Sequence, residues 1–229
     1  MSISIDELCD TLDVKEIPPS EAEEVPTSDN KYGNLFDGFA LPTHRVISPI
    51  VSERLNGAKS VLEAGFGTGF RLLYYALNNP NTEFVALDNN PDLFESLEDR
   101  MRRLGVNNVT LHQYDIFELK IADWRHQCVL AIDCMPNEVP SRLYDVGIRT
   151  RTDLMKTAFV FFGQMVKKME RPSFFASVDY AGWSQKKRRV YSKLGERIGI
   201  SRIRAESFSY QKQGEDRKSG TLFSRPLKV

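Results

Sequence analysis

Residues 60–70 read Ser-Val-Leu-Glu-Ala-Gly-Phe-Gly-Thr-Gly-Phe. A short apolar run ends in an acid, Glu63, and is followed by glycine at three alternate positions, Gly65, Gly67 and Gly69. Glycine is needed where the backbone must take positive φ or lie directly against a ligand. The amides at the start of the next helix are then free to bind a polar group. The stretch predicts a strand that turns sharply into a helix, with a ligand site at the turn.

Several kinds of ligand site use glycine-rich turns of this sort. A dinucleotide-binding turn has the form G-x-G-x-x-G, and here its third glycine is replaced by Phe70. A phosphate-binding P-loop needs Gly-Lys-Ser/Thr, and this turn contains no lysine. The acid followed by alternate glycines resembles motif I of class I S-adenosylmethionine-dependent methyltransferases. Another nucleotide or adenosine binder, or a purely structural turn, are the alternatives.

Strand-like and helix-like segments alternate from residue 59 onward, which is typical of an α/β sheet with crossover helices. The expected strands are 59–64, 83–88, 108–115, 127–133 and 173–179, with an antiparallel pair at 201–210 and 220–227. The expected helices are 43–55, 68–78, one from Asn90-Pro91 to Gly105, 151–169 and 185–198. This order resembles the class I methyltransferase fold over residues 59–227. The resemblance implies a doubly wound, mostly parallel seven-stranded sheet of order 3-2-1-4-5-7-6, with the last strand antiparallel and helices on both faces.

Each of the first four expected strands ends in or near a carboxylate: Glu63, Asp88, Asp115 and Asp133. Carboxyl ends of parallel strands meet at one rim of the sheet, so these acids would repel one another there. Cationic and hydroxyl-rich ligand groups would relieve that repulsion. S-adenosylmethionine offers a sulfonium, an ammonium, a ribose diol and an adenine amine. It is therefore the expected cofactor, with S-adenosylhomocysteine as product.

The resemblance also implies roles for individual residues. Asp88 would accept hydrogen bonds from the ribose hydroxyls. Asp115 would accept from the adenine amine while Ile116 covers a ring face. Glu63 would orient the glycine turn or the methionine part of the cofactor. The residues expected to bind the cofactor are Glu63, Gly65, Phe66, Gly67, Gly69, Asp88, Asn89, Asp115, Ile116 and Asp133.

The acceptor side is expected at two places. Residues 133–138, Asp-Cys-Met-Pro-Asn-Glu, occupy the position of the family's motif IV, but they depart from the Asn/Asp-Pro-Pro-Tyr form of many nucleobase N-methyltransferases. Residues 32–39 are aromatic and rich in glycine, and they are expected to form a lid ahead of the 43–55 helix. Asp133 and His44 are the candidate general bases. The expected acceptor-binding residues are Tyr32, Phe36, Met135, Pro136 and Asn137.

Composition indicates whether the chain spans a membrane, forms disulfides, binds a metal or divides into domains. The chain has 229 residues, 41% of them hydrophobic, and no run long enough for a transmembrane helix. The three cysteines form no disulfide-like framework, and His126 with Cys128 and Cys134 matches no common zinc pattern, so we expect no metal and a cytoplasmic protein. Residues 1–30 hold nine acids and one lysine and contain three prolines, which suggests a flexible acidic leader. The expected division is leader 1–30, lid-like segment and helix 31–58, and cofactor-binding domain 59–229.

The favoured function is methyl transfer from S-adenosylmethionine to a nitrogen, oxygen or carbon of a small molecule. A methyltransferase for protein or RNA is the alternative, because residues 184–229 hold thirteen basic and four acidic side chains. An aminopropyltransferase of the same fold and a non-catalytic partner protein also remain open. No membrane partner is expected, and the sequence leaves the oligomeric state open.

Overall fold

A computed structural model describes residues 2–17, 33–114, 126–132, 169–178, 204–210 and 218–224. The described helices are α1 (Ile5–Leu12), α2 (Gly33–Leu55), α3 (Phe70–Asn78) and α4 (Asp92–Leu104). The described strands are β1 (Ser60–Ala64), β2 (Glu83–Asp88), β3 (Val109–Gln113), β4 (His126–Ile132), β5 (Met169–Val178), β6 (Arg204–Tyr210) and β7 (Lys218–Ser224).

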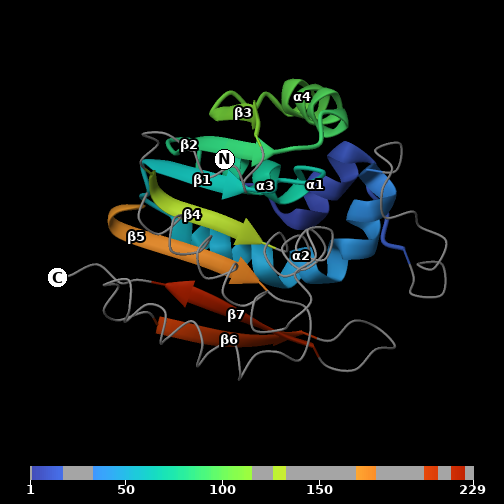
Figure 1. The fold of residues 1–229 in the computed structure, drawn as a ribbon. Coiled ribbons are helices and arrows are strands. Elements are labelled where there is room, and N and C mark those ends of the chain that lie inside the picture. Colours follow the sequence, from blue (N-terminus) through green and yellow to red (C-terminus); the bar gives the residue numbers. More distant parts are fainter. Residues whose placement is uncertain are drawn as a thin grey trace, which may run out of the picture.

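The described strands form one sheet in the order β3-β2-β1-β4-β5-β7-β6. The first five strands pair in parallel, whereas β7 pairs antiparallel with both β5 and β6. Figure 1 shows the strands following one another down the sheet, with the β7 arrow opposed to those of β4 and β5. β1 pairs with β2 on one side and with β4 on the other. From β1 the chain builds β2 and β3 toward one edge of the sheet and then crosses to β4 on the other side, so the strand order reverses at β1. In open α/β sheets, ligands bind beyond the carboxyl ends of the strands at such a reversal.

The predicted α/β class is confirmed, and most predicted elements lie within a few residues of the observed ones. The β2 bounds are as predicted. β5 begins at Met169, which the sequence assigns to the preceding helix, and runs to Val178. Met169 pairs with His126 of β4, and such a nonlocal contact overrides the local helical pattern. The predicted helix 185–198 and the rest of the predicted helix 151–169 lie outside the described residues.

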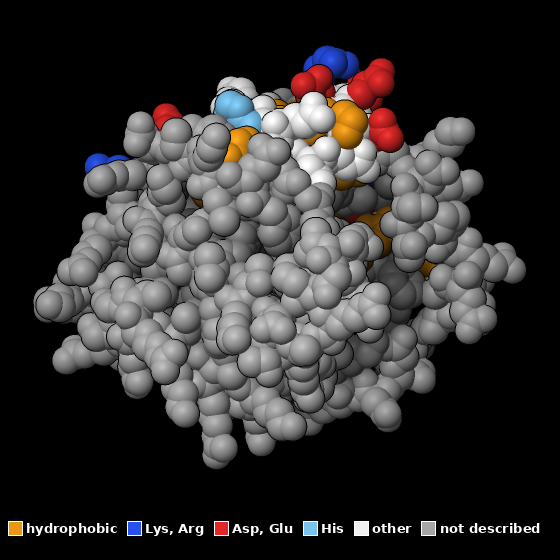
Figure 2. Space-filling model, viewed as in Figure 1, with side chains coloured by type: hydrophobic (Ala, Val, Ile, Leu, Met, Phe, Trp, Pro, Cys, Tyr) orange, Lys and Arg blue, Asp and Glu red, His pale blue; other side chains and the backbone are white. Residues whose placement is uncertain are grey.

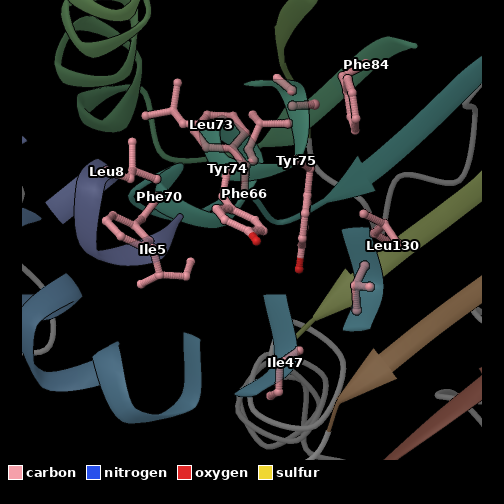
Figure 3. Close-up of a cluster of buried hydrophobic side chains, with 14 of the residues drawn as sticks. Ile5, Leu8, Ile47, Phe66, Phe70, Leu73, Tyr74, Tyr75, Phe84 and Leu130 are labelled. Carbon is pink, nitrogen blue, oxygen red and sulfur yellow. The ribbon is translucent and has the colours of Figure 1, made fainter. Parts of the chain in front are cut away.

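The expectation of a flexible leader is wrong for residues 5–12, which form α1. Ser4 and Glu7 make a capping box: each side chain bonds the other's backbone amide, at 3.1 and 2.7 Å. The apolar face of α1 joins the main core, where Figure 3 shows Ile5 and Leu8 beside Phe70. The acids occupy the opposite face, so a high acidic content is compatible with a docked amphipathic helix.

The N-terminal half of α2 differs from the prediction as well. The helix begins at Gly33, ten residues before the predicted start at 43, and continues through Pro42 and Pro49, so residues 33–39 belong to it. Its buried positions repeat at helical spacing, which places one continuous face against the rest of the protein. The buried positions on this face are Leu41, His44, Ser48, Val51 and Leu55. This long-range packing explains why two prolines do not end the helix.

The opposite sides of α4 differ in polarity. Acidic side chains gather at the upper edge of the molecule in Figure 2, where Figure 1 places α4. The helix buries Leu97 and Arg100 and exposes its remaining charged residues.

Within the part of the chain that the structure describes, no helix has the length and apolar character needed to cross a bilayer.

Candidate functional site

The turn between β1 and α3 is built from three glycines with positive φ: 73° at Gly65, 57° at Gly67 and 77° at Gly69. The Gly65 amide donates to the Leu87 carbonyl of β2 at 2.7 Å, which ties the turn to the neighbouring strand. The amide of Gly69 donates to the Phe66 carbonyl at 3.0 Å. The sharp strand-to-helix turn predicted from the sequence is therefore present, and it lies beside the end of β2.

The glycines at positions 67 and 69 meet different surroundings. A Cβ atom at Gly69 would lie 2.4 Å from Leu97 Cδ1 of α4, so this position has no room for a side chain. A Cβ atom at Gly67 would meet nothing within 4 Å among the described atoms. Gly69 is thus required by packing between α3 and α4, whereas Gly67 borders space that no described atom occupies.

Asp88, at the end of β2, holds the glycine turn through its carboxylate. Its Oδ2 accepts a hydrogen bond from the Gly67 amide at 3.0 Å, and its Oδ1 accepts from the Asn90 amide at 3.0 Å. Burial raises the pKa of Asp88, opposed by the backbone amides of Asn90, Gly67 and Asn89. Each carboxylate oxygen keeps capacity for a further donor. The carboxylate can therefore bind hydroxyl groups and organise the loop at the same time.

Glu63, near the end of β1, is 1% exposed. Its Oε2 has no hydrogen-bond partner among the residues that the structure describes. The pKa of Glu63 is raised to about 7, mainly by burial; the Arg71 charge opposes this shift, and the nearby Asp88 adds to it. A buried carboxyl without a partner is costly unless a ligand completes its hydrogen bonds. Glu63 is consequently suited to bind a donor or a cation at the turn.

His44 lies on α2 and is buried, and its ring stacks on Phe70, the first residue of α3, at 5.0 Å between ring centroids. Burial, aided by the Arg71 charge, holds the pKa of His44 well below its usual range, so the ring is neutral at neutral pH. Neither ring nitrogen has a hydrogen-bond partner among the described residues. His44 is thus an uncharged imidazole that packs beside the first turn of α3.

The other predicted site residues fall into three sets: a buried one, two exposed ones, and residues outside the described part of the chain. Phe66 is buried and packs edge-on against Phe94 at 5.2 Å, so its ring belongs to the core. Phe36 is 43% exposed on the first turns of α2, and Asn89 is exposed just after β2. The remaining predicted site residues lie outside the described part of the chain: Tyr32, Asp115, Ile116, Asp133, Met135, Pro136 and Asn137.

Three residues at the turn were missed by the sequence reasoning: Asp37, Thr68 and Arg100. Arg100 of α4 and Asp37 of α2 form a buried ion pair at 2.8 Å beside Thr68. A signal for Arg100 did exist in the sequence. It lies three residues after Leu97, on the apolar stripe of its helix, and a charge in that place requires a buried partner.

Comparisons with known proteins agree with this geometry. Residues 55–145 match the family model of a methyltransferase domain. A tRNA (guanine-N(7)-)-methyltransferase of Rhizobium johnstonii is 29% identical over 155 residues, which cover 66% of this chain and 62% of that protein. The ribosomal RNA small subunit methyltransferase G of Actinobacillus pleuropneumoniae is 34% identical over 70 residues, covering 31% of this chain and 34% of the relative. The chain therefore spans less than two thirds of the length of either relative.

The fold resembles that of solved methyltransferases. The N-methyltransferase NodS of Bradyrhizobium japonicum, in complex with S-adenosylhomocysteine, superposes with a TM-score of 0.56 at 15% identity, covering 90% of this chain and 96% of NodS. Residues 55–145 thus resemble a methyltransferase domain, and the chain shares the fold of this solved methyltransferase.

The described residues at the turn fit S-adenosylmethionine, the cofactor expected from the sequence. Glu63 supplies a buried carboxyl oxygen without a partner, Gly67 borders open space, and Asp88 retains acceptor capacity. These three features provide acceptors for hydroxyl and ammonium groups next to backbone that a ligand can approach closely.

Proposed function

We propose that this chain transfers a methyl group from S-adenosylmethionine to a nitrogen, oxygen or carbon atom of a small molecule. The observation that carries the proposal is the carboxylate of Asp88 bonded to the Gly67 amide, with Oε2 of Glu63 on the adjacent strand, which has no partner among the described residues. The order β3-β2-β1-β4-β5-β7-β6 supports the seven-stranded methyltransferase arrangement. The proposed division is a segment of residues 1–30, a second of 31–58 and a cofactor-binding domain of 59–229.

In this proposal the cofactor is held mainly by residues at the ends of the strands. Asp88, with Asn89 beside it, binds the ribose hydroxyls, while Asp115 and Ile116 bind the adenine. Glu63 and the backbone of the glycine turn bind the amino-acid part. The bound cofactor supplies an electrophilic methyl group on a sulfonium. The protein's contribution is to hold donor and acceptor in line at short distance, which lowers the entropic cost of the reaction.

Proton removal depends on the acceptor. A neutral amine needs little help, whereas an oxygen or carbon acceptor needs a base in reach of its proton. We propose His44 or Asp133 for that role. The low pKa of His44 supports the candidate in one respect, because the neutral ring is the form that can accept a proton. The burial of the ring means that only an acceptor bound against α2 and α3 would reach it.

A small acceptor is favoured by the first turns of α2. Phe36 is an exposed aromatic side chain on a helix whose next residue, Asp37, is paired to Arg100 at the glycine turn. Such a side chain is suited to cover an apolar acceptor near the cofactor. Tyr32 and the segment with Met135, Pro136 and Asn137 would complete that surface in this proposal.

RNA is the second candidate acceptor, because the two curated relatives are a tRNA and a ribosomal RNA methyltransferase. The basic side chains of residues 184–229 would provide the contacts to phosphate.

Transfer of labelled methyl groups distinguishes a small-molecule acceptor from an RNA acceptor. Purified protein is incubated with methyl-labelled S-adenosylmethionine and an extract divided into a small-molecule fraction and an RNA fraction. The proposal predicts label in the small-molecule fraction and a mass gain of one methyl in the product. Label in the RNA fraction that ribonuclease releases, and that declines steeply with salt, would support the second candidate. An aminopropyl gain in a parallel incubation with decarboxylated S-adenosylmethionine, or no methyl transfer to either fraction, would contradict both.

A further inference from the structure

A charged pair is buried where α2, α4 and the glycine turn meet. Arg100 Nη1 lies 2.8 Å from Asp37 Oδ2, and the two side chains are only 7% and 0% exposed. Every other charged side chain of α4 is exposed, as the acidic edge in Figure 2 illustrates. Arg100 is therefore turned away from the charged face of its helix and toward the turn.

The pair converges on Thr68, the residue between Gly67 and Gly69. The Thr68 hydroxyl donates to Asp37 Oδ1, and the Thr68 carbonyl accepts from Arg100 Nη1 at 3.0 Å. Arg100 Nη2 also donates to Asn34 Oδ1 at 2.6 Å. Two helices that are distant in sequence thus hold the hydroxyl and the carbonyl of one loop residue.

Stability alone does not account for this arrangement. A buried ion pair gains little net free energy, because desolvation of both charges offsets their attraction, and apolar replacements are often as stable. The turn itself is a run of positive-φ glycines with few conformational restraints of its own. A loop of this kind keeps one geometry only when its surroundings fix it. Thr68 adjoins Gly67, whose amide bonds Asp88, so a displaced Thr68 would shift the Asp88 contact as well.

We propose that Asp37, Arg100 and Thr68 are positioning residues that hold the glycine turn in the geometry that binds the cofactor. This inference rests on the proposed function, since it assigns these residues to cofactor binding at the same site. None of the three is among the residues that the sequence analysis assigned to the cofactor. They act through the backbone of Gly67 and through Asp88, and the inference includes no contact between them and the cofactor.

The test compares cofactor affinity with stability in matched variants. Thr68→Val removes the hydroxyl donor at nearly constant shape, and Thr68→Ser restores it. Asp37→Asn removes the charge. Ser52→Ala is the control, because Ser52 of α2 accepts a buried hydrogen bond at 3.0 Å from Asn79, at the far end of α3 from the turn. Affinity for S-adenosylhomocysteine is measured by calorimetry well below each variant's melting temperature, and KM for S-adenosylmethionine is measured in the transfer assay.

Thr68→Val and Asp37→Asn are expected to raise the dissociation constant roughly 10- to 100-fold, the range for loss of a charge-assisted hydrogen bond. KM for S-adenosylmethionine should rise with it while kcat changes little, and Thr68→Ser should recover near wild-type affinity. Ser52→Ala should lower the melting temperature and leave affinity unchanged. Equal affinity in wild type and Thr68→Val, or equal losses in all variants including Ser52→Ala, would overturn the inference.

A double variant tests the inference without leaving an unpaired charge in the core, so it remains informative if the single variants fail to fold. Asp37→Leu combined with Arg100→Met replaces the charged pair with apolar side chains of similar size. We expect it to fold with a wild-type melting temperature and to bind S-adenosylhomocysteine at least about tenfold more weakly, because the restraint on Thr68 is gone. Wild-type affinity in this variant overturns the inference while leaving the proposed function intact. A wild-type protein that binds no S-adenosylhomocysteine overturns both.

Discussion

The Asp88 carboxylate accepts a hydrogen bond from the Gly67 amide at 3.0 Å, which joins the end of β2 to the turn after β1. The contact is possible because Gly67 takes a φ of 57°, which directs its amide toward the neighbouring strand. An acid expected only to bind the ribose therefore also organises the turn. In the proposed function, this carboxylate therefore couples the geometry of the turn to ligand binding.

Alanine at Gly67 and at Gly69 should rank in opposite order in their effects on stability and on cofactor binding. Gly69→Ala places a Cβ 2.4 Å from Leu97 and strains a φ of 77°, so it should lower the free energy of unfolding by at least about 2 kcal/mol. Gly67→Ala meets open space and should cost roughly 1 kcal/mol, the strain of its positive φ. It should nevertheless weaken binding of S-adenosylhomocysteine more than Gly69→Ala does. Urea unfolding and calorimetry on both variants provide the comparison, and the reverse ranking in either measurement would be inconsistent with the assigned roles.

Glu63 should make the free protein less stable as pH rises. Its pKa is about 7 in the folded state against a reference of 4.5, so the folded state binds the proton more tightly. The contribution of Glu63 to stability is complete below pH 4.5 and is lost as pH rises toward 7. Glu63→Gln should therefore be more stable than wild type at pH 8 by up to about 3 kcal/mol, with little difference at pH 4.5.

Urea unfolding at several pH values checks this prediction, with Glu53→Gln as an exposed control on α2. Glu63→Gln should also bind S-adenosylhomocysteine more weakly at pH 8, because it lacks the negative charge that pairs with an ammonium group. A pH profile of unfolding that is the same for wild type and Glu63→Gln would rule out the raised pKa.

His44→Phe tests the base assignment without removing the aromatic contact to Phe70. For an oxygen or carbon acceptor, loss of a general base should lower kcat by at least about 100-fold. Affinity for S-adenosylhomocysteine should stay close to that of wild type, because the stack beside the glycine turn is kept. An unchanged kcat with such an acceptor would show that His44 is a packing residue and would leave Asp133 as the candidate.

Residues 5–12 should contribute to stability as part of the core. Leu8 is fully buried, so Leu8→Ala should cost about 2–5 kcal/mol of unfolding free energy. Asp10→Ala, on the exposed side of the same helix, should change it by less than about 0.5 kcal/mol. Denaturant unfolding of both variants and of wild type measures these differences in unfolding free energy. Equal stability of Leu8→Ala and wild type would mean that α1 does not dock as described.

The sequence was informative where the structure is decided locally. The glycine turn and β2 with Asp88 follow from spacing and from strand propensity over a few residues. The docking of α1 was not predicted, because the many acids of residues 1–30 indicated a flexible segment. Ile5, Leu8 and Leu12 nevertheless repeat at helical spacing, which is the pattern of a docked helix.

Contacts between distant segments could not be predicted in the same way. The pairing of Asp37 with Arg100 depends on how α2 and α4 pack around Thr68, and no local pattern encodes that arrangement. The start of α2 at Gly33 is similar, because burial of one helix face outweighs the two prolines within it. Sequence patterns thus gave the position of the candidate site, while its supporting contacts required the structure.

Calorimetric titration of S-adenosylhomocysteine into wild type and Asp88→Ala tests the central claim most directly, with Asp92→Ala as an exposed control at the start of α4. Wild type and Asp92→Ala should bind with one site per chain, and Asp88→Ala should bind at least about 100-fold more weakly, because it loses both the ribose acceptor and the bond to Gly67. Binding of equal strength in all three proteins, or no binding by wild type, would contradict the account.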